Sequence, residues 1–136
     1  SVEISLESTA PFFTTDASIS SSGNITNHPV WKRSTSFNAW EMYLNGTPGE
    51  AASEYAAPSR AESLKGLPPT YLSVGSEDLF RDEDIGFGQK LIEDGVPCEM
   101  SVFPGMYHAG EGFAPAAKVS RRLNQSFLAA LKDALT

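Results

Sequence analysis

The sequence predicts an α/β fold with parallel strands, because two short apolar runs flank one helical pattern. The first run, Tyr71–Val74, follows two prolines that forbid a helix, and it stops at a Gly-Ser pair. The second run, Met100–Phe103, stops at a Pro-Gly pair. Strand, helix and strand within about 35 residues are typical of a right-handed βαβ unit whose strands are parallel neighbours.

The helix expected between these strands carries Ile85, Gly88, Leu91 and Ile92 at helical spacing. Acidic residues crowd its start and Gly95 lies just past its end, both of which are typical helix boundary signals. We therefore expect a helix between the two strands.

A terminal amphipathic helix follows, and Pro115 fits its first turn. Its apolar side chains recur at three- and four-residue spacing, with basic and amide side chains on the opposite face. The apolar set is Val119, Leu123, Phe127, Ala130, Leu131 and Ala134. This helix is expected to pack on the sheet.

The first 67 residues contribute less regular structure. Residues 2–6 alternate apolar and polar groups, which predicts a third strand, and residues 8–27 form a Ser-rich loop. Residues 36–44 predict a short helix with Ser36 as its N-cap, and residues 61–65 predict one helical turn. We expect a single domain over residues 1–136, in which residues 68–136 form a strand-helix-strand-helix unit.

Composition excludes several classes of protein. A net charge of −7 with ten scattered basic residues argues against nucleic-acid binding. One cysteine and two histidines exclude an internal disulfide and a structural zinc cluster, and no phosphate-binding glycine loop is present, so no cofactor or metal is expected. No apolar run is long enough to span a membrane. Sequons at Asn24, Asn45 and Asn124 leave secretion open, although the absence of a signal peptide favours the cytoplasm.

A carboxylate and an imidazole, which can act together in acid–base catalysis, follow the two predicted strands. Asp78 comes after the first strand and His108 after the second. Because parallel neighbours lie about 4.8 Å apart, loops from their carboxyl ends meet at one sheet edge, where open α/β sheets bind ligands. An acid that orients a histidine is two thirds of a nucleophile triad. Taken singly, Asp78 could simply cap a helix and His108 could be structural.

Six apolar side chains are candidates for a ligand pocket, although each could equally belong to the core. They are Phe12, Phe13, Trp40, Phe80, Met106 and Phe113.

The stretch Leu-Pro-Pro-Thr-Tyr-Leu-Ser-Val-Gly-Ser-Glu-Asp-Leu-Phe-Arg-Asp-Glu, with Gly-Met-Tyr-His downstream, resembles the hormone-sensitive-lipase-like carboxylesterases of the α/β-hydrolase fold. The segments at Trp40–Leu44 and Tyr55–Pro58 also resemble that family. The resemblance implies that Asp78 is the triad acid and His108 the general base. Leu79 stands where the family often has Pro, and Ala109-Gly110 where it often has Gly-Phe; neither change removes a reacting group.

The family nucleophile lies in Gly-x-Ser-x-Gly and its oxyanion donors in His-Gly-Gly, and this sequence contains neither motif. The resemblance therefore implies the C-terminal part of an α/β-hydrolase, with its last three parallel strands. Its expected partner is the N-terminal portion of the same enzyme, which carries the serine, and its substrate a small ester. A non-catalytic relative that binds a small apolar ligand and a self-contained interaction domain stay open, as does a homo-oligomer.

Overall fold

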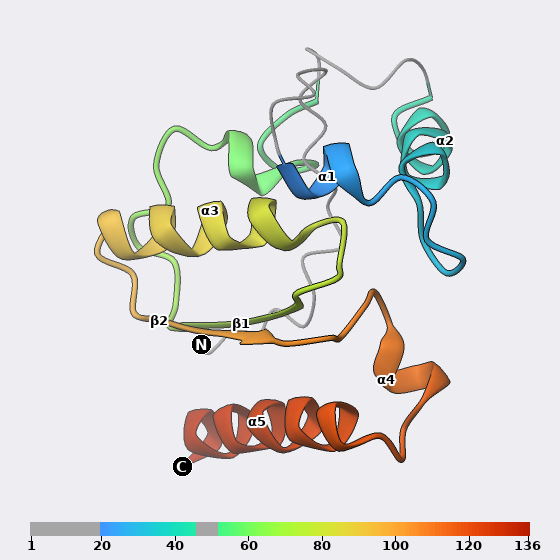
Figure 1. Cartoon of the computed structure of the whole chain (residues 1–136). Coiled ribbons are helices and arrows are strands. Elements are labelled where there is room, and N and C mark those ends of the chain that lie inside the picture. Colours follow the sequence, from blue (N-terminus) through green and yellow to red (C-terminus); the bar gives the residue numbers. More distant parts are fainter. Residues whose placement is uncertain (1–19, 46–51) are drawn as a thin grey trace.

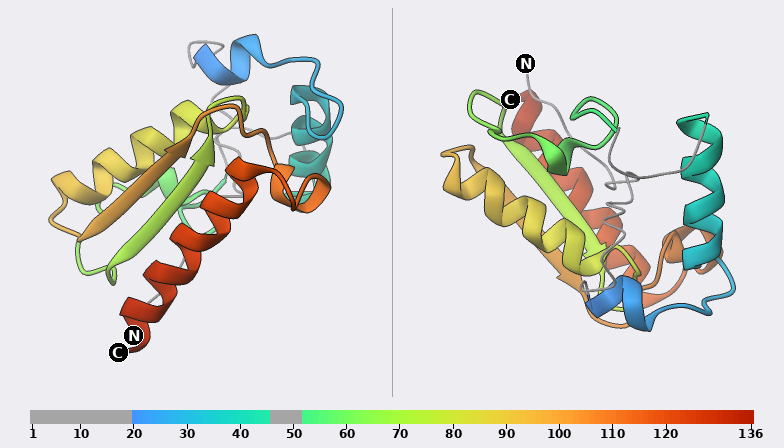
Figure 2. Two further views of the ribbon diagram at one scale, coloured as in Figure 1. Left: turned by 60° about the horizontal axis from the view of Figure 1, so that its bottom comes forward. Right: turned by 90° about the horizontal axis from the view of Figure 1, so that it is seen from above.

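The computed structural model describes residues 20–45 and 52–136 as three layers, with a two-stranded sheet between two helices (Figure 1). Helix α3 (Arg81–Glu93) covers one face of the sheet and helix α5 (Lys118–Leu135) the other, as the turned views also show (Figure 2). The third strand expected at residues 2–6 lies outside the described residues.

The two strands are β1 (Thr70–Gly75) and β2 (Cys98–Phe103), and they pair in parallel from Thr70↔Cys98 to Gly75↔Phe103. The predicted βαβ unit is therefore confirmed. Every residue of β1 after the first is buried, as expected for a strand covered on both faces.

Helix α3 crosses from β1 to β2 and places the fully buried Leu91 against Leu72 of β1. Leu64 and Val96 complete this cluster. Ile92 shares the helical spacing but is 59% exposed, so it lies off the stripe that faces the sheet.

On the opposite face, α5 buries Leu123 against Phe103 and Met106, with Val119 packed beside them. The Tyr71 hydroxyl of β1 also donates a hydrogen bond to Ser126 Oγ at 2.8 Å. The placement of Pro115 in the first turn was wrong, because α5 begins only at Lys118. The short helix α4 (Gly110–Phe113) precedes it.

The N-terminal half departs further from the sequence expectations. Helix α1 (Ser20–Asn24) lies within the stretch predicted as a loop, and helix α2 (Arg33–Tyr43) begins three residues before the predicted cap. Ser36 is instead a fully buried position inside α2, where its hydroxyl oxygen accepts a hydrogen bond from Trp31 Nε1. The expected helical turn at residues 61–65 is replaced by a 3-10 turn, η1 (Pro58–Arg60).

Within residues 20–45 and 52–136, no helix combines the length and apolar character needed to cross a lipid bilayer.

Candidate active site

Two loops leave the sheet at the same edge. The β1 loop (residues 76–80) follows Gly75, and the β2 loop (residues 104–109) follows Phe103, which is the strand partner of Gly75. Register therefore starts both loops side by side, so that short excursions bring their side chains together.

Asp78 of the β1 loop and His108 of the β2 loop are in direct contact. His108 Nδ1 lies 3.1 Å from Asp78 Oδ2, and the other carboxylate oxygen accepts a hydrogen bond from the Phe80 amide at 3.0 Å. An ionised carboxylate only accepts hydrogen bonds, so we assign the imidazole proton to Nδ1, which leaves Nε2 as the basic nitrogen. The side chains are only 10% and 16% exposed, so surrounding protein shields the pair from water.

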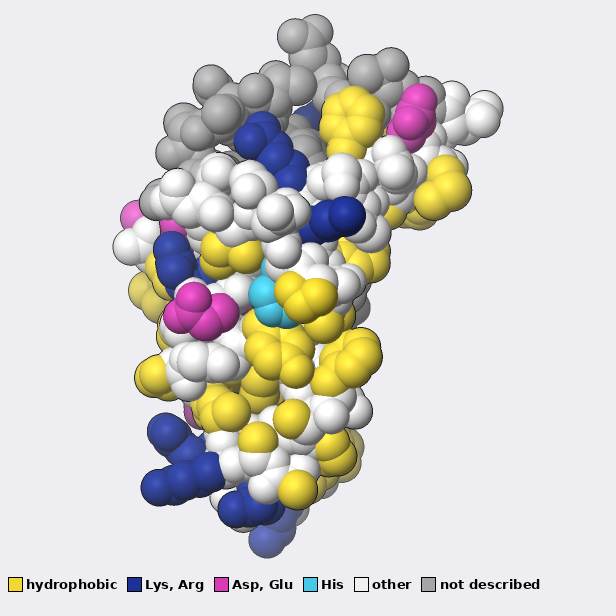
Figure 3. All heavy atoms as spheres, turned by 45° about the vertical axis from the view of Figure 1, so that its right-hand side comes forward, with side chains coloured by type: hydrophobic (Ala, Val, Ile, Leu, Met, Phe, Trp, Pro, Cys, Tyr) yellow, Lys and Arg dark blue, Asp and Glu magenta, His cyan; other side chains and the backbone are white. Residues whose placement is uncertain are grey.

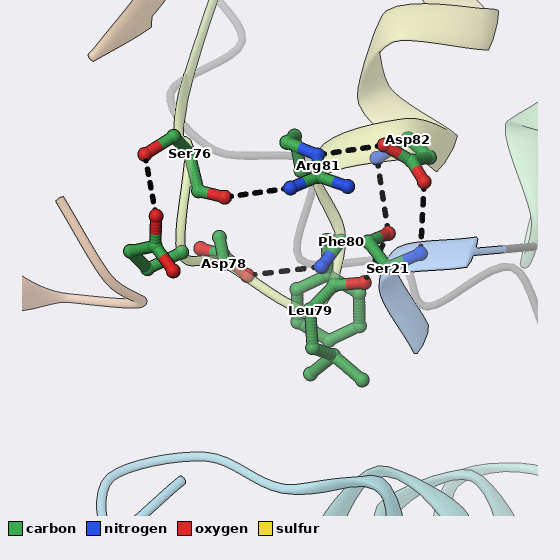
Figure 4. A network of polar contacts seen from close by, with 8 residues as sticks. Ser21, Ser76, Asp78, Leu79, Phe80, Arg81 and Asp82 are labelled. Carbon is green, nitrogen blue, oxygen red and sulfur yellow. Dashed lines mark hydrogen bonds and ion pairs between the residues drawn. The ribbon is translucent and has the colours of Figure 1, made fainter. Parts of the chain in front are cut away.

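The β1 loop is held from the side of the N-terminal helices (Figure 4). Ser21 of α1 donates from its amide to Asp82 Oδ2 at 2.8 Å and from its hydroxyl to the Leu79 carbonyl at 2.9 Å. The same hydroxyl oxygen accepts a hydrogen bond from the Asp82 amide at 3.1 Å. Ser21 thus provides an acceptor for one of the backbone N–H groups at the start of α3, which have no partner within the helix. These contacts explain why a short helix forms where composition alone indicates a loop.

Arg81 closes the β1 loop from the other side. Its guanidinium donates to the Ser76 carbonyl at 2.8 Å and to Asp82 Oδ1 at 2.7 Å (Figure 4). The Arg81 hydrogen bond, supported by those from Ser21, lowers the pKa of the Asp82 carboxyl, and it outweighs the opposing effect of burial.

Backbone and side-chain hydrogen bonds also join the two loops directly. The Ser76 amide donates to the Phe103 carbonyl at 3.0 Å, and the Gly105 amide donates to Ser76 Oγ at 2.8 Å. The Glu77 amide donates to the Met106 carbonyl at 2.9 Å. This close approach requires Gly75, because a Cβ there would lie 2.1 Å from the Met106 carbonyl oxygen.

Two aromatic rings lie close to the His108 imidazole. Phe80 meets it edge-on with ring centroids 5.4 Å apart, and Trp31 lies 5.5 Å away at an interplanar angle of 39°. His28 and Tyr107 form a second ring contact between the same two segments, at 4.9 Å. In the space-filling view, hydrophobic side chains gather around a histidine that is partly visible at the surface (Figure 3).

The candidate pocket residues are distributed unevenly. Phe80 and Met106 line a small cavity beside Asp78 and His108; its volume of about 20 Å³ holds roughly one water. Trp40 is buried elsewhere, against Tyr43, and Phe113 is 66% exposed.

Phe12 and Phe13 lie outside the described residues. Trp31 was not among the candidates, because its approach to His108 is a tertiary contact without a sequence signature. In the part of the chain that the structure describes, no three His, Cys, Asp or Glu side chains form a group able to hold a metal ion.

Comparison with known proteins gives consistent matches. A family model described as the alpha/beta hydrolase fold matches residues 8–111. The chain is 32% identical over 107 residues to esterase LipI of Mycobacterium tuberculosis, a match that covers 76% of this chain and 32% of that protein. It is also 32% identical over 82 residues to an acetyl-hydrolase of Streptomyces hygroscopicus, covering 60% of this chain and 26% of the relative.

Solved structures agree. A bacterial heroin esterase superposes with a TM-score of 0.79 at 36% identity, covering 88% of this chain and 38% of that one. Esterase LipW from Mycobacterium marinum gives 0.79 at 31% identity, with 85% and 36% covered. The chain thus spans about a third of the length of the relatives that it matches.

Proposed function

This chain belongs to the alpha/beta hydrolase fold family, and from that premise we propose that it supplies the acid and the base of a serine carboxylesterase. The predicted fold class is thereby confirmed, and the relatives that it matches are named esterases. Hydrolysis of a carboxylic ester is the activity that these relatives and the geometry of the site support together.

The observation that carries this proposal is the contact between Asp78 and His108. It joins an acid and a base across the loops of two adjacent parallel strands, at the sheet edge where α/β folds bind ligands. A carboxylate on Nδ1 fixes the tautomer in which Nε2 can accept a proton, and it stabilises the imidazolium that results.

The proposed reaction has two stages. In the first, His108 Nε2 accepts the proton of a serine hydroxyl as the serine oxygen bonds to the ester carbonyl carbon. The bond to the leaving oxygen then breaks, and His108 returns the proton to that oxygen, which releases the alcohol. In the second stage a water loses its proton to His108 and attacks the acyl-serine. The acid is released and the serine regains its proton.

The serine and the oxyanion donors are proposed to come from a segment of the enzyme outside this sequence. The sequence has no Gly-x-Ser-x-Gly, and relatives are about three times its length. Asp78 and His108 would meet that serine at the carboxyl edge of the sheet. The apolar surroundings of His108 favour a small, uncharged ester.

The test uses the native-length protein that contains this sequence, assayed on p-nitrophenyl butyrate. We expect His108→Ala to lower kcat by about 10⁴-fold or more while the thermal unfolding midpoint changes little. Leu128→Ala, at an exposed position of α5, is the matched control and should retain full activity. Hydrolysis that survives His108→Ala would refute the triad, and apolar ligand binding without any hydrolysis would favour a non-catalytic relative.

A further inference from the structure

The segment before α2 is folded onto the β2 loop by two ring contacts. His28 lies against Tyr107 and Trp31 against His108, so residues three apart in one segment meet adjacent residues of the β2 loop. The Val30 amide donates a hydrogen bond to the side-chain nitrogen His28 Nδ1 at 3.2 Å, which tightens this turn. Trp31 is thereby held beside the imidazole.

The indole of Trp31 is also oriented from its other end. Its Nε1 donates to the hydroxyl of Ser36, which is completely buried in α2. A hydrogen bond to a buried partner restricts rotation of the ring, and a rigid aromatic surface loses little entropy when a ligand packs on it.

The two rings beside His108 differ in access. Phe80 is only 4% exposed, so little of its ring can be reached from solvent. Trp31 is partly exposed, so a ligand can reach part of its ring. The cavity that Phe80 lines beside His108 holds only about one water, so of these two rings Trp31 offers more surface to a substrate.

We infer that Trp31 forms the alcohol side of the ester site and selects esters whose alcohol carries an aromatic ring close to the ester oxygen. This inference rests on the proposed function. In the reaction above, His108 Nε2 protonates the leaving oxygen, so that oxygen must come within about 3 Å of the imidazole. A ring one carbon beyond the oxygen then falls within stacking distance of a neighbour whose centroid is 5.5 Å from the imidazole.

The acyl group of the ester is positioned by the serine and the oxyanion donors and not by Trp31. Its carbonyl carbon is bonded to the serine and its oxygen points to the oxyanion donors. Trp31 is therefore expected to discriminate among alcohols and not among acyl chains.

The first test compares three esters as substrates of the native-length enzyme. Benzyl acetate and ethyl acetate differ only in the alcohol, whereas ethyl hexanoate and ethyl acetate differ only in the acyl group. Trp31→Ala should lower kcat/KM for benzyl acetate about tenfold more than for ethyl acetate, while the ratio of ethyl hexanoate to ethyl acetate stays unchanged. Trp31→Phe should keep most of the benzyl preference. Tyr43→Ala, which removes an exposed aromatic ring of α2, is the control and should leave both ratios unchanged.

If loss of the Trp31 ring disturbs His108, kcat/KM falls by the same factor for every ester. The ratio of kcat/KM between two esters is therefore unaffected by such a disturbance. An unchanged benzyl-to-ethyl ratio in Trp31→Ala, or a change in the acyl ratio instead, overturns the inference even though His108-dependent hydrolysis persists. Should Trp31→Ala fail to fold, Ser36→Ala, which frees the indole, must weaken the same benzyl preference.

A second test does not depend on activity. Benzyl alcohol added to the native-length protein should shift the indole N–H resonance of Trp31, identified by its absence in Trp31→Phe, whereas ethanol should not. Absence of this shift overturns the inference. Ester hydrolysis that is missing or independent of His108 refutes the proposed function separately.

Discussion

The β1 loop and the β2 loop deliver one reacting group each, but they are held in different ways. Asp78, Leu79 and Phe80 of the β1 loop are all buried, and the loop is tied to α1 and α3 by Ser21 and Arg81. In the β2 loop only Met106 is buried, and the backbone on both sides of it turns through left-handed conformations at Gly105 and Ala109.

This difference indicates which loop determines the position of the other. The β1 loop is fixed by side-chain hydrogen bonds and burial, whereas the β2 loop is fixed largely by its contacts with the β1 loop and with the ring of Trp31. We therefore expect substitutions in the β1 loop to affect both reacting groups. The following substitutions test that asymmetry.

The largest effect is expected for Asp78→Asn. The amide has nearly the shape of the carboxylate but no charge, and it no longer enforces the Nδ1–H tautomer of His108. In the native-length enzyme kcat should fall by about 10³-fold or more with little change in thermal unfolding. Asp133→Asn on the exposed side of α5 should have no effect, and wild-type turnover in Asp78→Asn would show that the acid is not needed.

Gly75→Ala tests whether the β2 loop depends on close packing against β1. The added Cβ would lie 2.1 Å from the Met106 carbonyl oxygen, so the β2 loop must move and carry His108 with it. A displacement of about 1 Å should cost roughly 10²-fold in kcat, and the overpacking about 1–3 kcal/mol in the free energy of unfolding by urea.

Gly112→Ala is the control for that substitution. A Cβ at Gly112 meets no atom within 4 Å, so both kcat and stability should be nearly unchanged. Equal effects of the two substitutions would show that proximity to Met106 is irrelevant.

Ser76→Ala removes a hydrogen bond between the two loops that lies outside the Asp78–His108 pair, the one from the Gly105 amide to the Ser76 hydroxyl oxygen. We expect a loss of about 1 kcal/mol in the free energy of unfolding and a fall in kcat of less than about tenfold. Ser76→Thr keeps the hydroxyl and should recover activity, while Ser63→Ala, at an exposed site, serves as the control. A larger loss in Ser76→Thr than in Ser76→Ala would contradict a role for the hydroxyl.

The smallest effect concerns Asp82, which anchors the β1 loop without touching His108. Its pKa is lowered in the folded state, chiefly by the Arg81 hydrogen bond, so the unfolded state binds the proton more readily. Its contribution to stability is therefore present above about pH 4 and is lost as the pH falls through the lower folded pKa.

Urea unfolding of wild type and Asp82→Asn from about pH 6 to about pH 3 measures this contribution. The two stability curves should converge toward acid pH, with wild type more stable at the upper end. Parallel curves would show that the Arg81–Asp82–Ser21 contacts add no pH-dependent stability.

The sequence alone was sufficient for the βαβ unit and the terminal helix. Prolines, glycines and apolar periodicity are local signals. β1, α3 and β2 appear where those signals predict them, and α5 appears with a later start than Pro115 indicated. Placing Asp78 and His108 at one edge followed from the parallel pairing of neighbouring strands, which the register confirms.

The tertiary structure decided what local signals cannot express. Nothing in the neighbouring sequence indicates that Ser21 and Ser36 are buried. The Ser21 hydroxyl donates to the Leu79 carbonyl, 58 residues away. The Ser36 hydroxyl accepts a hydrogen bond from the indole of Trp31, five residues away. The position of Trp31 beside His108 has the same origin. Hydrogen bonds and ring contacts between distant segments depend on the whole packed arrangement, whereas strands and helices arise from the pattern of neighbouring residues.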